Sequence, residues 1–546
     1  MPEALGRHPL RSTTPWSRRL GPWLGAALAI SLAGCQTAPG TPAPDTSTTP
    51  GPQPTDVAGT SGPPDPTAEA LPPVTGQQPS ERIGAFYYPW YRTADEGGWD
   101  GWNSGERFEP PGDIGSDYYP VLGPYSSSSR EVVAQHFAWL REAGIGVAIS
   151  SWWGRGDYRD EVVPLLLEMG ERYGIRIAIH IEPYEGRTAE RVVEDVRYLY
   201  ERYGDSLALY RTTAPTTWTG EGSKGVFFLW AAESTNFTDV VEPGYWREAM
   251  DAIHAMPESG VVIANTLLGS RVDSDHFDGL YNYATQRLED TRGFAWAAAI
   301  PPGAWYVPSV LPGFSASRIG GDPSYRLDRL EGATYDTQWE AALGIGLEPQ
   351  LVTITSFNEW PEGSQIEPAV GGLDNGKGYD YLDYGSLGED GYLGRTADWA
   401  ARFADVTWPE AVTVQLRLST TSDGTFVRLL SGGYWMRPSI SDVSNRAIDA
   451  GFQFDRLALS QPIPDAEAGR RVEVILDVDL AYLDPAGRFE FEIDRGHYGS
   501  TRLEVFVERG GELVRVGDFT WAGIKPGPVN TKTFRLPVRD LIDASS

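Results

Sequence analysis

Three carboxylates follow a strand-like apolar run near residue 355. The stretch ITSFNEWPEGSQIEP carries Glu359, Glu362 and Glu367. Cleavage of a glycosidic bond needs one group that protonates the departing oxygen and another that supplies or activates a nucleophile, and two carboxylates with separated pKa values do this near neutral pH. Pro361 disfavours helical geometry at Trp360, so we expect a sharp turn that could aim Glu359 and Glu362 into one site. A solvated acidic loop is the competing interpretation.

Glu182 occupies a similar position at the end of a different apolar run, IAIHI. A carboxylate between His180 and Tyr184 at a strand end would be desolvated unless it held something polar, which favours a functional role. An ion pair with Arg187 or a helix-cap role would account for the same residue.

Other hydrolytic chemistries have no sequence signal. The chain has six His residues, none in HxH or HExxH spacing, and it has no DxDxDG loop. A GxSxG nucleophile elbow is also absent. We therefore predict no metal and no cofactor.

Elements that could position these acids alternate along the middle of the chain. Candidate strands are Ile83–Tyr88, Val147–Ser151, Arg176–Ile181, Val226–Trp230, Val261–Thr266, Gly279–Tyr283, Trp305–Val307 and Val352–Ser356. Candidate helices are Arg130–Ala143 behind a Ser cap, Asp160–Tyr173, Ala189–Tyr203, Tyr245–His254 and Thr337–Leu343. This alternation predicts an α/β fold, a (β/α)8 TIM barrel over residues 81–407, in which catalytic groups come from the C-terminal ends of strands. No GxGxxG turn follows the first strand, which disfavours dinucleotide binding.

The pattern changes after about Thr407. Segments such as VTVQLRL (Val412–Leu418) and RLEVFVE (Arg502–Glu508) alternate apolar and polar residues, as half-buried antiparallel strands do. We predict an all-β, sandwich-like accessory domain over residues 408–546.

The N-terminal region predicts a surface anchor. Arg18 and Arg19 precede an apolar run too short to span a bilayer, which ends in LAGC at Cys35, the only cysteine. Residues 1–35 resemble a bacterial lipoprotein signal peptide with a lipobox, so Cys35 is a candidate lipidation site. A cleaved secretory peptide with an incidental cysteine is the alternative. Residues 36–80 are rich in Pro, Thr and Gly, which indicates a disordered tether. We expect a membrane-anchored protein of the cell envelope that faces outside the cytoplasm.

Composition limits the partners. The 546-residue chain has a formal net charge of −30, which repels phosphate backbones and makes nucleic acid an unfavourable partner. Aromatic residues make up 12% of the chain, and their flat apolar faces suit sugar rings.

Six motifs together resemble glycoside hydrolase family 99, the endo-α-1,2-mannosidases and endo-α-1,2-mannanases. They are FYYPWY (Phe86–Tyr91), SWWG (Ser151–Gly154), HIEPYEGR (His180–Arg187), FDGLYNY (Phe277–Tyr283), PSVLPGF (Pro308–Phe314) and SFNEWPEGSQIEPA (Ser356–Ala369). The resemblance covers about Arg82 to Asp405 and implies a (β/α)8 barrel that acts on an α-linked mannose-containing glycan. It also implies a retaining mechanism in which the sugar's own 2-hydroxyl is the nucleophile and a 1,2-anhydro sugar is the intermediate.

The resemblance implies roles for individual residues. Glu359 would deprotonate the 2-hydroxyl, and Glu362 would protonate the leaving oxygen and then activate water. Glu182 would bind the sugar that is cleaved. The other implied sugar-binding residues are Trp152, Tyr88, Tyr184, Tyr281, Tyr283, Asn358 and Trp360.

One position departs from the family pattern, which usually reads NEWHEG, because Pro361 stands where a His is expected. Loss of an imidazole between the acids removes a hydrogen-bond donor and stiffens the loop. Two alternatives follow: a hydrolase of the same fold that acts on another α-linked glycan, or a glycan-binding lipoprotein without catalysis.

Overall fold

The computed structural model describes residues 71–406, except 284–299, 301–302, 322–325 and 344–347, and a set of β-strands beyond residue 410. The predicted signal peptide, its Cys35 and most of the predicted tether lie outside the described residues. In the part of the chain that is described, no helix combines the length and the apolar run needed to cross a membrane.

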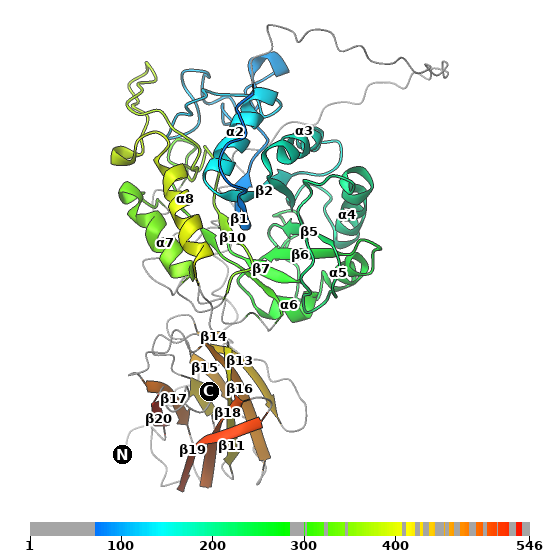
Figure 1. The fold of residues 1–546 in the computed structure, drawn as a ribbon, viewed down its shortest axis with the longest axis vertical. Coiled ribbons are helices and arrows are strands. Elements are labelled where there is room, and N and C mark those ends of the chain that lie inside the picture. The colour runs from blue at the N-terminus through cyan, green and yellow to red at the C-terminus, as the bar shows by residue number, and fades with distance from the viewer. Residues whose placement is uncertain are drawn as a thin grey trace, which may run out of the picture.

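The first folded unit is a parallel β-barrel (Figure 1). Its strands are β1 (Ser80–Tyr87), β2 (Ile145–Trp152), β3 (Arg176–Ile181), β5 (Lys224–Leu229), β6 (Gly260–Asn265), β7 (Gly279–Tyr281), β8 (Trp305–Val307), β9 (Ser309–Val310) and β10 (Val352–Ile354). They are ordered β8-β7-β6-β5-β3-β2-β1-β10-β9, and the short β4 (Arg211–Thr212) pairs antiparallel with β5.

The barrel closes at Pro308, the single residue between β8 and β9. Strand β8 pairs with β7 and β9 pairs with β10, both in parallel register. Pro308 has no amide hydrogen to donate, so it interrupts one strand and leaves two short pieces. Its carbonyl still accepts from Thr353 N at 2.8 Å. Counting β8 and β9 as one strand gives the eight strands of a TIM barrel.

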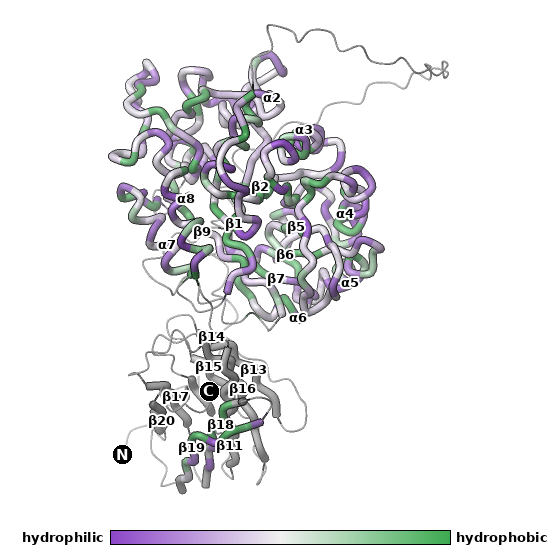
Figure 2. The backbone as a smooth tube through the Cα atoms, viewed as in Figure 1, coloured by the Kyte–Doolittle hydropathy of each residue, from purple (hydrophilic) through white to green (hydrophobic). Residues whose placement is uncertain are grey.

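Helices surround the barrel (Figure 1). They are α2 (Arg130–Glu142), α3 (Tyr158–Tyr173), α4 (Ala189–Tyr203), α5 (Arg247–His254), α6 (Ser270–Asp275), α7 (Ala333–Leu343) and α8 (Gly391–Ala404). The predicted Ser cap of α2 is confirmed, because the side chain of Ser129 accepts from Val132 N. Thr188 caps α4 in the same way, accepting from Arg191 N. Figure 2 shows the strands as mostly hydrophobic and the outer helical turns as largely hydrophilic.

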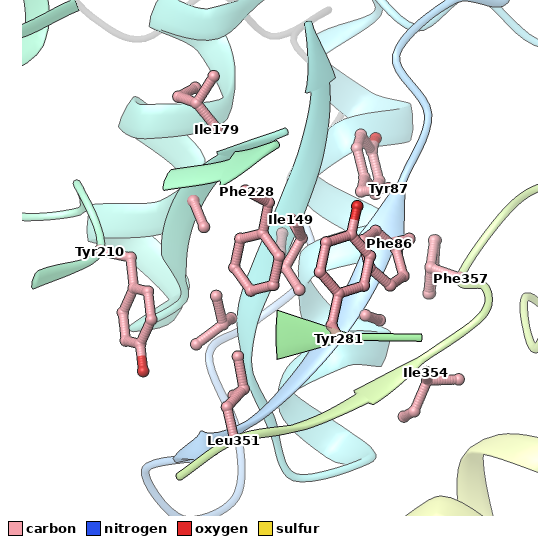
Figure 3. Packing of buried hydrophobic residues seen from close by; sticks show 14 of the residues in the cluster. Phe86, Tyr87, Ile149, Ile179, Tyr210, Phe228, Tyr281, Leu351, Ile354 and Phe357 are labelled. Carbon is pink, nitrogen blue, oxygen red and sulfur yellow. The ribbon is translucent and has the colours of Figure 1, made fainter. Parts of the chain in front are cut away.

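Aromatic and branched side chains fill the barrel interior. Every residue of β2 and β5 is buried, as expected for strands covered on both faces. Phe86 lies at the centre, with ring centroids 6.1 Å from Phe228 and 5.5 Å from Tyr281 (Figure 3). This layer of packed side chains lies beneath the C-terminal strand ends.

All eight predicted strands and all five predicted helices correspond to elements of the structure, with ends displaced by a few residues. The sequence did not predict α6, α8 or the short strands β4 and β9. The predicted division of the chain into residues 1–35, 36–80, 81–407 and 408–546 stays a prediction.

Beyond residue 410 the described residues form strands. They are β11 (Ala411–Thr420), β12 (Phe426–Leu429), β13 (Met436–Asp442), β14 (Phe452–Gln453), β15 (Ala458–Pro462), β16 (Arg470–Asp479), β17 (Arg488–Asp494), β18 (Ser500–Arg509), β19 (Glu512–Ala522) and β20 (Thr531–Pro537). They pair antiparallel in two five-stranded sheets, which agrees with the predicted alternation. That the sheets pack as a sandwich stays a prediction.

Candidate active site

The segment after β10 turns sharply, as predicted. The amide of Gly363 donates to the carbonyl of Trp360 at 3.0 Å, so residues 360–363 form a β-turn. Pro361 takes the second position of this turn, where a fixed φ is favourable, and Glu362 takes the third. Gly363 has φ +59°, and a Cβ there would lie 2.8 Å from the carbonyl oxygen of Ser315. We call residues 356–367 the acid loop.

Hydrogen bonds fix the backbone of both acids. Ser356 Oγ accepts from Glu359 N at 2.7 Å and lies 3.1 Å from Ser364 Oγ. The carbonyl of Glu362 accepts from Ser315 N at 2.8 Å. The two carboxylates therefore emerge from a loop whose main chain is tied both to itself and to the segment after β9.

Glu182 follows β3 and is 5% exposed. Its Oε1 accepts from Ser151 Oγ at 2.9 Å and lies 3.1 Å from Nδ1 of His180. Arg187 does not pair with it, because its guanidinium donates to five main-chain carbonyls between residues 181 and 235. The competing interpretation of Glu182 as the ion-pair partner of Arg187 is wrong.

Burial and mutual repulsion raise the pKa values of the acids in the acid loop. Burial, followed by the charges of Glu362 and Glu182, holds the pKa of Glu359 well above its usual value. Burial, followed by the charge of Glu182, raises the pKa of Glu362 to about 7. The three carboxyls are thus close enough to influence one another, although they come from β3 and β10. The site keeps a carboxylic acid protonated near neutral pH, which a general acid requires.

Two predicted tyrosines lie beside the acids. The hydroxyls of Tyr88 and Tyr283 are hydrogen-bonded to each other. Burial raises the pKa of both, and the charge of Glu359 contributes in each case. Tyr283 is partly exposed, and its ring centroid lies 4.6 Å from that of Trp230. The pair can present a hydroxyl group to a ligand next to the carboxylates.

Four predicted sugar-binding residues expose no side-chain surface in this structure, and their role in sugar binding stays a prediction. They are Trp152, Tyr281, Asn358 and Trp360, all at 0% exposure. Each has a partner inside the protein: Trp152 Nε1 donates to Asp160, Tyr281 contacts His180, Asn358 bonds both the amide and the carbonyl of Tyr88, and Trp360 Nε1 donates to Glu367. They support the site from behind.

Trp153, which the sequence did not single out, is the partly exposed member of the Trp pair. Its Nε1 donates to Ser151 Oγ at 3.1 Å, and Ser151 Oγ donates to Glu182. Trp153 directly follows β2, whose last residue is the buried Trp152. Tyr184 is also partly exposed, and its hydroxyl donates to Asp195.

Glu367, the third acid of the opening motif, is a supporting group. It is fully buried, accepting from Tyr125 OH at 2.7 Å and from Trp360 Nε1 at 2.8 Å, while its other oxygen lies 3.1 Å from His136 Nε2. The site therefore has three candidate functional carboxylates and one structural carboxylate.

A TIM barrel with mutually shifted carboxylates and aromatic side chains at the C-terminal strand ends fits the class of glycoside hydrolases. The family model described as glycosyl hydrolase family 99 matches residues 80–405, and the chain belongs to this family.

Known proteins are similar to this chain over about three fifths of its length. A human glycoprotein endo-alpha-1,2-mannosidase-like protein is 32% identical over 381 residues, which cover 61% of this chain and 78% of that protein. The mouse glycoprotein endo-alpha-1,2-mannosidase is 30% identical, covering 62% and 77%. The solved GH99 endo-alpha-mannosidase of Bacteroides thetaiotaomicron is 31% identical with a TM-score of 0.52, covering 60% of this chain and 98% of that one.

Proposed function

We propose that the protein is a retaining endo-α-mannosidase that hydrolyses internal α-1,2-mannosidic bonds. The observation that carries the proposal is the group of three carboxyls, Glu182, Glu359 and Glu362, in which burial and like charge raise the pKa of both acids of the acid loop. The names of the family members reported above supply the expected linkage.

In the first step Glu359 takes the proton of the 2-hydroxyl, and O2 attacks C1 of the same sugar. The bond from C1 to the leaving oxygen breaks, and Glu362 gives its proton to that oxygen. A raised pKa makes Glu359 a stronger base once it is ionised, which suits proton removal from a weakly acidic hydroxyl.

In the second step the ionised Glu362 takes a proton from water, whose oxygen attacks C1 of the 1,2-anhydro sugar. The C1–O2 bond breaks, and Glu359 returns its proton to O2. Both steps invert C1, so the product keeps the original α configuration. In this proposal Glu182, which accepts from Ser151 Oγ, accepts hydrogen bonds from the sugar hydroxyls.

The test uses an α-1,2-linked manno-oligosaccharide with the wild type, Glu359→Gln and Glu362→Gln. We expect both variants to lose nearly all turnover and to retain measurable oligosaccharide binding, and we expect NMR of early wild-type product to show the α anomer. Undiminished turnover by either variant, or an initial β anomer, would contradict the mechanism.

Pro361 motivates a second candidate, hydrolysis of another α-linked glycan, because this proline stands at the partly exposed turn between the acids. Products from a panel of α-linked glycans separate the two candidates. Binding with no release of reducing ends after long incubation would instead favour a non-catalytic glycan-binding protein.

The proposed location is the outside of a membrane, through a lipid on Cys35. The LAGC motif after a short apolar run supports it. Cys35→Ala should move the protein from the membrane fraction to the soluble fraction, and a variant that stays membrane-bound would refute the anchor.

A further inference from the structure

A buried arginine lies against the acid loop. Arg329 comes from the segment between β9 and α7 and is 8% exposed. Its Nη2 donates to the carbonyls of Gly363 at 3.0 Å and Gln365 at 2.6 Å. Among the described residues, no carboxylate forms an ion pair with it. Burial of a guanidinium without a counter-ion is costly, so its position needs a reason.

Three tyrosine rings hold this cation. The guanidinium carbon lies 4.8 Å from the ring centroid of Tyr118 and 4.7 Å from those of Tyr384 and Tyr392. Cation–π contacts of this kind are strongest when water is excluded, as it is here. The ring cage stabilises the charge without a carboxylate, and a carboxylate there would add another negative charge near the catalytic acids.

The backbone around Arg329 is adapted to it. A Cβ on Gly313 would lie 2.5 Å from Cγ of Arg329, so a glycine at that position gives the side chain its path. Phe314 and Leu327 form an antiparallel bridge, and the next residue after Phe314 is the one whose amide holds the carbonyl of Glu362. One segment thus binds the acid loop on both sides of the Glu362–Gly363 peptide.

We propose that Arg329 is a positioning residue for Glu362: by holding the carbonyls of Gly363 and Gln365, it sets the place of the catalytic acid in the turn. The inference rests on the proposed function. Arginine is required because one nitrogen must reach two carbonyls while the planar group stacks on the rings, and the compact ammonium of lysine does not stack in this way.

Arg318 in the same β9–α7 segment offers a matched control. Its guanidinium carbon also lies near three aromatic rings, those of Phe108, Tyr379 and Tyr381, at 4.8, 4.0 and 5.4 Å. It pairs with Asp113, and none of its described contacts is with the acid loop. Loss of either arginine should destabilise the fold, but only Arg329 should affect the chemistry.

The experiment measures kcat, KM, the pH profile of kcat/KM and thermal unfolding for Arg329→Met, Arg329→Lys and Arg318→Met. We expect kcat to fall roughly 100-fold in Arg329→Met, the effect of about 1 Å of misplacement of a catalytic group, and less in Arg329→Lys. KM should change little. The basic limb of the profile should move to lower pH, because a looser turn hydrates Glu362.

Arg318→Met should be less stable than wild type and should keep the wild-type kcat and the wild-type basic limb of the pH profile. If Arg329→Met does not fold, Arg329→Lys and Gly313→Ala, which displaces the arginine stem, are measured instead. Folded Arg329 or Gly313 variants with wild-type kcat and pH profile would overturn the inference, as would the same kinetic losses in Arg318→Met. A wild type that hydrolyses no α-linked glycan would refute the proposed function instead.

Discussion

Removing the charge of Glu182 should shift the pH profile of the enzyme toward acid. Glu362 must be protonated to donate to the leaving oxygen, so its pKa sets the basic limb of kcat/KM. Burial first and the charge of Glu182 second raise this pKa from 4.5 to about 7. That difference corresponds to about 3 kcal/mol in favour of the protonated form.

Burial is the larger cause, so Glu182 supplies less than half of the effect. In Glu182→Gln we therefore expect the basic limb to fall by at most about 1 pH unit. Total activity should also fall, because Gln binds the sugar less well, but the shape of the profile is read independently of its height.

The assay is the rate at low substrate concentration between pH 4 and 9 on an α-1,2-linked manno-oligosaccharide. Glu185→Gln is the control, since Glu185 is exposed in the loop after Glu182 and does not contribute to the pKa of Glu362. An unmoved limb in Glu182→Gln, or an equal movement in the control, would refute the electrostatic reasoning.

Three further predictions follow from the same contacts. In the folded state the pKa of Glu362 is raised, so ionisation between pH 4.5 and about 7 lowers the stability of the protein. Glu362→Gln should therefore melt at a higher temperature than wild type at pH 8 but not at pH 4. Equal melting differences at both pH values would contradict this. Trp153→Ala should raise KM with little loss of stability, whereas Trp152→Ala should cost about 3–5 kcal/mol in urea unfolding, and the reverse pattern would restore Trp152 as the sugar contact. His136→Leu removes a partner of the buried Glu367 and should cost about 3–5 kcal/mol, measured by urea unfolding at pH 7, where a neutral substitution would show the pair to be dispensable.

The barrel was predictable because its signal is local. Short β-branched and aromatic runs mark each strand, and amphipathic stretches mark the longer helices. Helix α8 was missed because Gly391 and Gly394 lower its intrinsic propensity. It forms because of tertiary packing: the ring of Trp399 stacks on Trp339 with centroids 5.7 Å apart and planes 3° apart. Helix α6 has only six residues and no apolar period to detect.

The site was predictable only where its residues are adjacent in sequence. The two acids share one turn, so their motif identifies both. Their supports are distant: Ser315 precedes Glu362 by 47 residues, and Tyr125 reaches Glu367 across 242 residues. No local pattern reports such contacts. The sequence also could not show whether Trp152 and Trp360 are buried or exposed, because a large aromatic residue suits a protein core as well as a sugar-binding surface.

Pro361 stands where the family pattern has a His, and the physical consequence we infer for this change is not loss of function. Burial and neighbouring carboxylates raise the pKa values of Glu359 and Glu362, so an imidazole between them is not needed to keep a proton on Glu362. The proline instead presets the backbone of the turn, and the anchors from Ser315 and Arg329 hold the residues that follow. We therefore expect the change to bear on which glycan is accepted, with the proton transfers left to the two carboxylates.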